Sequence, residues 1–237
     1  MNGTHSDKNG NTVSGLPIAN VDGTILVPEQ FREVYGYIRV YLDVSTSMRI
    51  VSAELARAFN KFLAELGENW VRAGGDPKKL HVAVKVFNSR IKKLGEFRSV
   101  TATERWNERT YDEHAGFGTA LRDALYEGAV KSEGLQLELY RMRPQPFIGV
   151  VVLSDGQDSQ STHQLPETRE AVTRAVAKGI RFSFCFVGTS ADQVMARHDA
   201  TCMGIPDATV VTAEKTEAGL DESMTMTAHT LFEAPHR

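Results

Sequence analysis

Hydrophobic and polar positions change their period along the chain, so that short apolar runs alternate with longer amphipathic segments. Short runs that are apolar, or that alternate apolar and polar residues, favour strands at 37–43, 80–87, 91–97, 147–153, 180–187 and 208–212. Apolar residues at spacings of three and four predict helices at 48–66, 119–130, 166–178, 191–199 and 214–232. The segment 131–146 is either a further helical piece or a loop. Strands and helices are therefore expected to follow one another almost throughout.

This alternation predicts an α/β fold. We expect a Rossmann-like, doubly wound, mostly parallel sheet of six strands with one antiparallel edge strand and with helices on both faces. The run at 91–97 follows its predecessor after the short turn Asn88-Ser89, so it is the expected antiparallel edge strand. The segment 98–118 has no periodicity, and a loop of this length usually has a function or covers another part of the structure.

The amino-terminal segment differs in composition from the rest. Residues 1–34 are expected to form a tail or extension, and residues 35–233 the folded domain. Residues 1–16 are polar and rich in Gly, Asn and Ser. The apolar residues at 25–27 and the short helical pattern at 29–34 favour either an extra strand or an arm against the domain.

Charge and cysteine content narrow the class of protein. The formal net charge is −3, which gives no electrostatic reason to expect a nucleic-acid partner. The cysteines, Cys185 and Cys202, do not suggest a disulfide framework. Neither the apolar core of a signal peptide nor an apolar stretch of membrane-spanning length occurs, so we expect a cytoplasmic protein with no membrane partner.

Oxygen-bearing residues gather where predicted strands end. Asp43 ends the first predicted strand and is followed at alternate positions by Ser45 and Ser47, and Asp155 lies just beyond another buried strand. In an open α/β sheet, ligands bind at the carboxyl ends of strands, near the point where the strand order reverses. Thr119, at the start of a predicted helix, can bring a further hydroxyl there. Carboxylate, hydroxyl and water oxygens are the donors that Mg²⁺ and similar hard cations prefer.

The pattern Asp43-x-Ser45-x-Ser47, then Thr119, then Asp155 resembles the metal-ion-dependent adhesion site of von Willebrand factor A domains. The likeness covers nearly the whole chain beyond the tail. It implies that both serines bind the metal directly, that both aspartates bind it directly or through water, and that the threonine joins or leaves as its loop moves. It further implies Mg²⁺, with Mn²⁺ or Ca²⁺ as alternatives, and a non-enzymatic module. The open position on the metal would take a carboxylate from a partner protein.

Simpler interpretations exist for parts of this site. The aspartate and serines of the first segment are residue types favoured at helix N-caps, and Asp155 is also typical of a turn after a strand. Neither explanation accounts for all the positions together. Asp123 and Asp158 are nearby in sequence, and they are either partners that position the metal ligands or acids that face solvent.

Two other functions stay open. Intracellular domains of this type resemble parts of larger machines, so the chain is alternatively a regulatory or scaffold subunit of an ATPase-linked or stress-resistance complex. A Mg²⁺-dependent phosphoryl-transfer enzyme with Asp43 as nucleophile is the other alternative. That chemistry needs a second acid and a lysine close by, which the segment around Asp43 does not supply. Motifs of metalloproteases, serine hydrolases and P-loop enzymes do not occur in the sequence.

Overall fold

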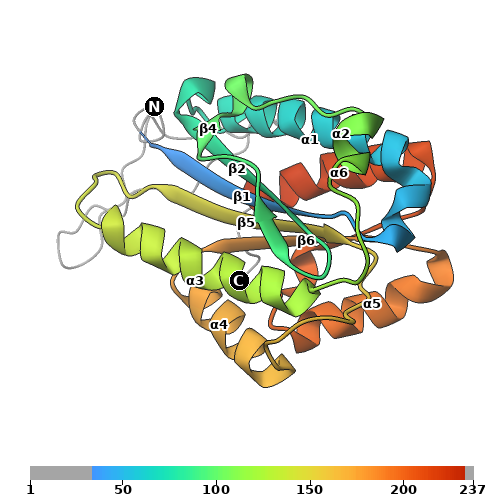
Figure 1. Cartoon of the computed structure of the whole chain (residues 1–237). Coiled ribbons are helices and arrows are strands. Elements are labelled where there is room, and N and C mark those ends of the chain that lie inside the picture. The colour runs from blue at the N-terminus through green and yellow to red at the C-terminus, as the bar shows by residue number, and fades with distance from the viewer. Residues whose placement is uncertain (1–33, 233–237) are drawn as a thin grey trace, which may run out of the picture.

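A mixed sheet of seven strands forms the centre of the protein (Figure 1). The computed structural model describes residues 34–232. Its strands are β1 (Gly36–Asp43), β2 (Leu80–Phe87), β3 (Ile91–Lys93), β4 (Arg98–Ser99), β5 (Phe147–Ser154), β6 (Arg181–Val187) and β7 (Val210–Ala213). Its α-helices are α1 (Ser52–Arg72), α2 (Glu108–Asp112), α3 (Leu121–Glu138), α4 (Leu165–Ala177), α5 (Ser190–Cys202) and α6 (Glu217–Phe232).

Strand β1 lies in the middle of the sheet, in the order β3-β2-β1-β5-β6-β7. It pairs in parallel with β2 on one side and β5 on the other, and β6 and β7 continue the parallel part. The chain leaves β1 toward β2 and later returns to the opposite side of β1 as β5. The strand order therefore reverses between β1 and β5, and the carboxyl ends of these two strands border the crevice in which sheets of this kind bind ligands.

The antiparallel part of the sheet is built on β2. Both β3 and β4 pair with β2 in the antiparallel direction. The predicted strand at 91–97 is shorter than expected, because pairing stops near Gly95, which has no side chain to pack. The two-residue strand β4 then adds a seventh strand to the six that were predicted. The predicted fold class is confirmed.

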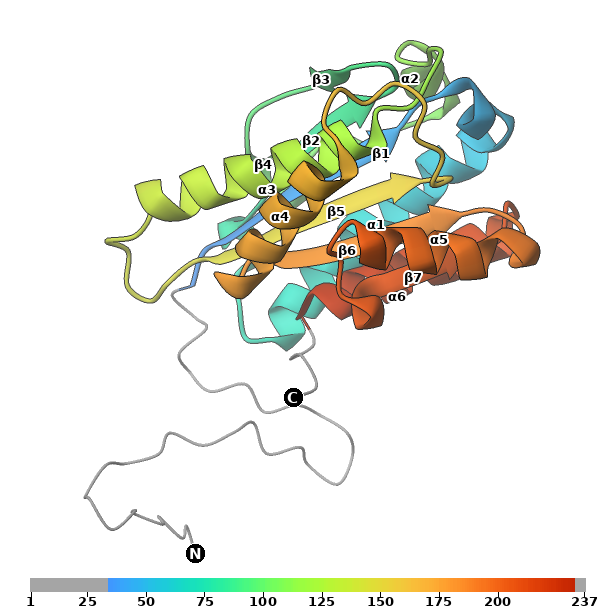
Figure 2. The same ribbon diagram turned by 90° about the horizontal axis from the view of Figure 1, so that it is seen from below.

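Helices cover both faces of the sheet (Figure 1 and Figure 2). Helices α1 and α6 pack against each other on one face, and their buried side chains join those of β1 and β2 in one core cluster. Helices α3, α4 and α5 lie on the other face and share a second cluster with β5 and β6. The sheet is thus buried on both sides, which explains the continuous apolar runs of its central strands.

Helix α1 begins later and ends later than predicted. A 3-10 helix, Thr46–Val51, precedes it, and α1 itself starts at Ser52. Gly67 does not end the helix, because Asn69 and Trp70 beyond it are buried and keep the helix in contact with the core. The helix stops before Gly74, whose φ of 84° is the left-handed conformation that commonly terminates helices.

The segment 98–118 covers helix α1, as its length suggested. Trp106 is buried and its ring lies against Phe59 of α1, with the two ring centroids 5.4 Å apart. The side chain of Asn60 donates a hydrogen bond to the Trp106 carbonyl (2.7 Å) and accepts one from the Trp106 N–H (2.8 Å). Paired bonds of this kind fix the loop against the helix and carry its carboxyl-terminal part toward the end of β1.

Other sequence expectations have mixed outcomes. Helix α3 continues to Glu138, so the first part of the segment 131–146, for which helix and loop were both open, is helical. Cys185 and Cys202 are free thiols. In the part of the chain that the structure describes, no helix combines the length and the apolar character that crossing a membrane requires. The predicted tail, 1–34, lies outside the described residues apart from Val34, which is buried.

Candidate metal centre

The carboxyl ends of β1 and β5 bring Asp43 and Asp155 to the same edge of the sheet. Leu42 of β1 pairs with Leu153 of β5, so Asp43 lies next to the carboxyl end of β5. Asp155 is the first residue after β5. The two carboxyl groups interact electrostatically, because the charge of Asp155 contributes to raising the pKa of Asp43. The structure therefore places these two predicted site residues together.

Asp43 is fully buried and held by two hydrogen bonds. Its Oδ1 accepts from the backbone N–H of Ser45 (2.8 Å), and its Oδ2 accepts from the hydroxyl of Ser154 (2.6 Å). Burial raises the pKa of Asp43 to about 6, although the bonds from Ser154 and Ser45 favour the charged form. The carboxylate is thus fixed in place, and a nearby cation would offset the cost of burying its charge.

Ser45 and Ser47 form a pair of hydroxyls beside Asp43. Their Oγ atoms lie 3.0 Å apart, with Ser45 buried and Ser47 exposed. Ser45 occupies the N-cap position of the 3-10 helix, but its side chain makes no capping hydrogen bond. The N-cap interpretation therefore does not explain this serine. Because α1 starts only at Ser52, the positive end of the α-helix dipole is further from the site than a helix starting at residue 48 would place it.

Thr119 is held against the loop that follows Asp155. Its backbone N–H donates to the hydroxyl of Ser159 (3.1 Å), and its carbonyl accepts from the N–H groups of Ser159 (2.9 Å) and Gln160 (3.0 Å). The preceding Gly118 has a φ of 75°, and a Cβ there would lie 2.4 Å from Cγ of Gln160. This turn requires glycine, and it sets the buried Thr119 at the start of α3.

The same edge also links Thr119 to Ser45. Gly116 forms an isolated parallel bridge with Ser45, and the Gly116 N–H donates to the carbonyl of Val44 (3.0 Å). The hydroxyl of Thr46 donates to the Gly116 carbonyl (3.2 Å). The loop before α3 is therefore tied to the segment after β1. All five predicted ligand residues lie at one edge of the sheet, and metal binding by them stays a prediction.

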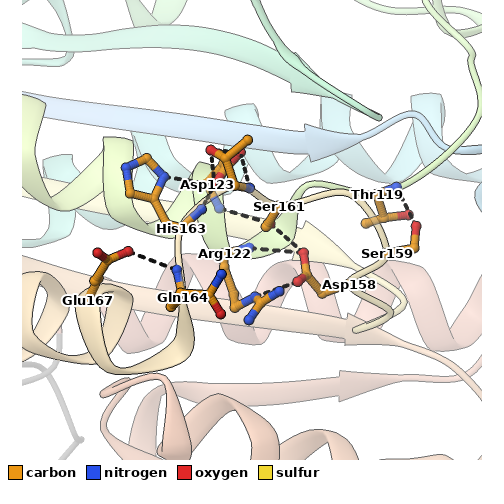
Figure 3. A network of polar contacts seen from close by, with 10 residues as sticks. Thr119, Arg122, Asp123, Asp158, Ser159, Ser161, His163, Gln164 and Glu167 are labelled. Atoms are coloured by element: carbon orange, nitrogen blue, oxygen red, sulfur yellow. Dashed lines mark hydrogen bonds and ion pairs between the residues drawn. The ribbon is translucent and has the colours of Figure 1, made fainter.

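Asp123 and Asp158 hold the surroundings of the site together rather than facing solvent (Figure 3). Asp158 forms an ion pair with Arg122 of α3. Asp123 accepts hydrogen bonds from the backbone N–H groups of Thr162 and His163. Burial alone would raise the pKa of Asp123, but these hydrogen bonds outweigh burial and lower it. Both acids bind the start of α3 to the loop after β5, which fixes the position of Thr119 relative to Asp155.

One carboxylate oxygen of Asp155 lacks a hydrogen-bond donor. The Asp155 side chain is 4% exposed, and within residues 34–232 its buried Oδ2 accepts no hydrogen bond. Its Oδ1 accepts only a long bond of 3.4 Å from the Gln157 N–H. The ammonium of Lys215 lies 3.9 Å from Oδ2, which is an ion-pair distance. A buried carboxylate oxygen without a donor is costly, so this atom favours a cation at the site.

The donor set fits a hard divalent cation. It combines two carboxylates with three hydroxyls, which are the oxygen ligands typical of Mg²⁺, Mn²⁺ and Ca²⁺. No cluster of three or more His, Cys, Asp or Glu side chains suited to a metal occurs among the described residues.

Three contributing residues were not identified from the sequence. Ser154 ends an apolar run, and a hydroxyl at that buried position was a usable signal. Tyr111 is fully buried and donates a hydrogen bond to the carbonyl of Asp43 (3.0 Å), yet it lies in the segment without periodicity. Lys215 reaches the site only through the path of the chain after β7, for which the sequence gives no signal.

Comparison with known proteins places the fold. No protein-family model matches the sequence, and no curated protein matches it. The pilus adhesin SpaC of Lactobacillus rhamnosus GG, in its open conformation, superposes with a TM-score of 0.62 at 10% identity, over 85% of this chain and 30% of the adhesin. Proximal thread matrix protein 1 of the mussel byssus, with a zinc-occupied MIDAS motif, gives a TM-score of 0.59 at 15% identity, over 83% of this chain and 48% of that protein.

A third solved structure has the same fold. The manganese-loaded TRAP protein of Plasmodium vivax has a TM-score of 0.52 and 14% identity, over 81% of this chain and 73% of that one. The chain spans less than half the length of the adhesin and of the byssus protein. At sequence identities this low, the likeness is one of fold. Together with the strand order and the position of the candidate site, they show that the chain has the fold of a von Willebrand factor A domain.

Proposed function

We propose that this protein is a divalent-metal-dependent protein-binding module. It presents a half-open metal site, with Mg²⁺ as the preferred ion, to a carboxylate of a partner protein. The observation that carries this proposal is the buried Oδ2 of Asp155, which has no hydrogen-bond donor among the described residues and lies at the same edge of the sheet as Asp43. Two buried carboxylates at one edge of the sheet repel each other, and a cation between them would offset that cost.

The ligand roles follow from the positions of the side chains. Ser45 and Ser47 offer their paired hydroxyls directly, and Thr119 offers a third from the start of α3. Asp43 is restrained by its two hydrogen bonds, so it acts through its remaining lone pairs or through water. When bound, the divalent ion supplies an electrophilic position that water or a carboxylate from another molecule can fill.

Two exposed apolar side chains beside the site favour a protein partner over a small ion or metabolite. Ile50 follows Ser47 in the 3-10 helix and is 81% exposed, and Phe117 precedes Thr119 and is 85% exposed. Single exposed apolar side chains are common on protein surfaces, so these two count only because they adjoin the ligand residues Ser47 and Thr119 in the chain. A partner segment that carries an acidic residue between apolar side chains would fit here. Its carboxylate would reach the metal and its apolar side chains would contact Ile50 and Phe117.

An enzymatic function is less well supported. Burial raises the pKa of the Cys185 thiol to about 12, so that thiol is not a nucleophile. Asp43, the nucleophile of the phosphoryl-transfer alternative, is buried, and both its oxygens already accept hydrogen bonds that restrain them from attacking a phosphorus atom. Asp155 and Lys215 do supply the second acid and the lysine that this chemistry needs. Phosphatase activity that is lost in Asp43→Ala but kept in Thr119→Ala would support that alternative.

The regulatory alternative differs in what a partner contacts. As a scaffold subunit of an ATPase-linked or stress-resistance complex, the protein would still use the metal edge if its partner supplies a carboxylate. A partner that stays bound in chelator would instead use another surface, such as the segment 98–118 that covers α1. Capture in the presence and absence of EDTA separates these two cases.

The direct test is metal binding together with partner capture. We expect the wild-type protein to bind Mg²⁺ in calorimetry and to retain a partner from its native cell extract only while Mg²⁺ is present. Asp43→Ala should lose both properties. Asp207→Ala is a matched control, because Asp207 is an exposed acid at the opposite, amino-terminal edge of the sheet, where it pairs with Arg197. Metal binding that survives in Asp43→Ala would overturn the proposal.

A further inference from the structure

Lys215 is the cation that faces Asp155 in this structure. It lies in the short segment between β7 and α6, after the carboxyl end of β7 and therefore at the same edge of the sheet as the candidate metal centre. Its Nζ is 3.9 Å from Oδ2 of Asp155, the oxygen that accepts no hydrogen bond from the described residues. Among the described residues, this is the one ion pair made by either aspartate of the site.

We propose that Lys215 is a built-in counter-ion for Asp155, which competes with the divalent cation and is displaced when the cation binds. This inference rests on the proposed function, because it assigns a role to Lys215 at the same metal site. It adds a residue that is not a metal ligand and that sets how tightly the site holds its metal.

The geometry suits a replaceable counter-ion. A separation of 3.9 Å satisfies the electrostatic attraction but is too long for a hydrogen bond, so the ammonium is not locked onto the carboxylate. The Lys215 side chain is 32% exposed and keeps contact with water, whereas the Asp155 side chain is 4% exposed. Returning the lysine to water therefore costs little free energy. The Asp155 carboxylate needs a positive charge beside it, which Lys215 supplies in the metal-free state and the divalent cation supplies in the metal-bound state.

The backbone that carries Lys215 is fixed. The hydroxyl of Thr216 accepts a hydrogen bond from the N–H of Gly219 (3.1 Å), and the Thr216 carbonyl accepts one from the N–H of Leu220 (3.0 Å). These bonds hold the first turn of α6. Only the side chain of Lys215 needs to move, and its charge already acts on a second acid, Asp192. Hydrogen bonds from Thr189 and, to a smaller degree, the charge of Lys215 lower the pKa of Asp192 at the start of α5.

Competition between lysine and metal couples the metal site to the start of α6. A partner or a movement that draws Lys215 away from Asp155 raises metal affinity. By linkage, metal binding favours that same displaced state to an equal degree in free energy. The side chain of Lys215 thereby couples metal occupancy to the first turn of α6.

The test measures Mn²⁺ binding by the electron paramagnetic resonance signal of the free ion, using full-length protein freed of metal with chelator. Lys215→Met keeps the aliphatic stem and removes the charge, and Lys215→Arg keeps the charge. We expect Lys215→Met to bind Mn²⁺ about three- to tenfold more tightly than wild type, as loss of one nearby like charge implies. Lys215→Arg should stay near wild type.

Lys178→Met is the matched control for net charge. Lys178 pairs with Glu133 and lies just beyond α4, before the amino-terminal end of β6 and thus at the opposite edge of the sheet. It should leave Mn²⁺ affinity unchanged. In chelator, Lys215→Met should also melt at a lower temperature than wild type, because Asp155 loses its counter-ion, and saturating Mn²⁺ should reduce that difference.

The outcomes separate this inference from the proposed function. If wild type binds Mn²⁺ and Lys215→Met binds it equally well, the role of Lys215 is wrong while the metal site stands. If wild type binds no Mn²⁺ but Lys215→Met does, the lysine occupies the site and the inference is supported in its strongest form. If neither binds Mn²⁺, the proposed function and the competition both fail.

Discussion

The hydroxyl of Ser154 donates a hydrogen bond of 2.6 Å to Oδ2 of Asp43, across the pairing of β5 with β1. The Ser154 oxygen also accepts a hydrogen bond from the N–H of Gly156 (3.1 Å). One side chain thus joins the carboxylate at the end of β1 to the turn that carries Asp155. The two halves of the candidate metal centre are positioned by a residue that is not itself a ligand.

Ser154→Ala tests this link. The substitution leaves the buried Oδ2 of Asp43 without its donor, which costs about 1–3 kcal/mol of unfolding free energy and weakens metal binding. Urea denaturation and calorimetric titration with Mg²⁺ measure the two effects. Ser132→Ala removes a buried hydroxyl that has no hydrogen-bond partner, so it should be neutral or slightly stabilising. Equal losses in the two variants would contradict the role given to Ser154.

The metal-free protein should lose stability as the pH rises from about 4 to about 6. Burial raises the pKa of Asp43 from 3.8 to about 6, so in this window the folded state binds a proton that the unfolded state has released. The contribution is fully present below the unfolded pKa and is lost as the pH passes the folded pKa. Its size is on the order of 2–3 kcal/mol.

Denaturation in EDTA across this pH range measures the effect, and Asp43→Asn provides the reference. The asparagine cannot titrate, so the fall in stability attributable to Asp43 should disappear in that variant. Parallel pH profiles for wild type and Asp43→Asn would show that Asp43 ionises normally. With saturating Mg²⁺, the wild-type profile should flatten or reverse, because metal ligands bind in their deprotonated form.

The sequence predicted the fold and the site unequally, for physical reasons. Strand β2 was predicted to the residue, because Val82, Val84 and Val86 form a buried run bounded by turn-forming residues. The start of α1 was misplaced, since a 3-10 helix has apolar spacings close to those of an α-helix over one turn. The five candidate ligands were found because strand ends and a known pattern marked them. Lys215 was not found, because its contact with Asp155 depends on the tertiary path of a loop.

Phe117→Ser should weaken partner binding without changing metal affinity. Phe117 is 85% exposed and precedes the Gly118-Thr119 turn, so its ring is available to a partner while its loss removes little packing. We expect partner capture in Mg²⁺ to fall and the melting temperature to stay within about a degree, as for other exposed substitutions. Leu137→Ser is the control, because Leu137 is 69% exposed on α3 but lies away from the metal edge. A similar drop in both variants would indicate a general effect of surface polarity.

Gly118→Ala should disturb the position of Thr119 and lower metal affinity. Gly118 has a φ of 75°, which alanine adopts only with strain, and the added Cβ would lie 2.4 Å from Cγ of Gln160. We expect a loss of about 1 kcal/mol or more in unfolding free energy.

Gly134→Ala provides the matched control, because Gly134 lies within α3 and a Cβ there meets nothing within 4 Å. Alanine at that helical position should stabilise the protein by about 0.5–1 kcal/mol and leave Mg²⁺ binding unchanged. The double variant Gly118→Ala with Gln160→Ala removes the steric contact but keeps the strained φ, so it should recover only part of the lost affinity. Full recovery would assign the effect to the contact with Gln160 alone, and unchanged Mg²⁺ affinity in Gly118→Ala would remove Thr119 from the proposed ligands.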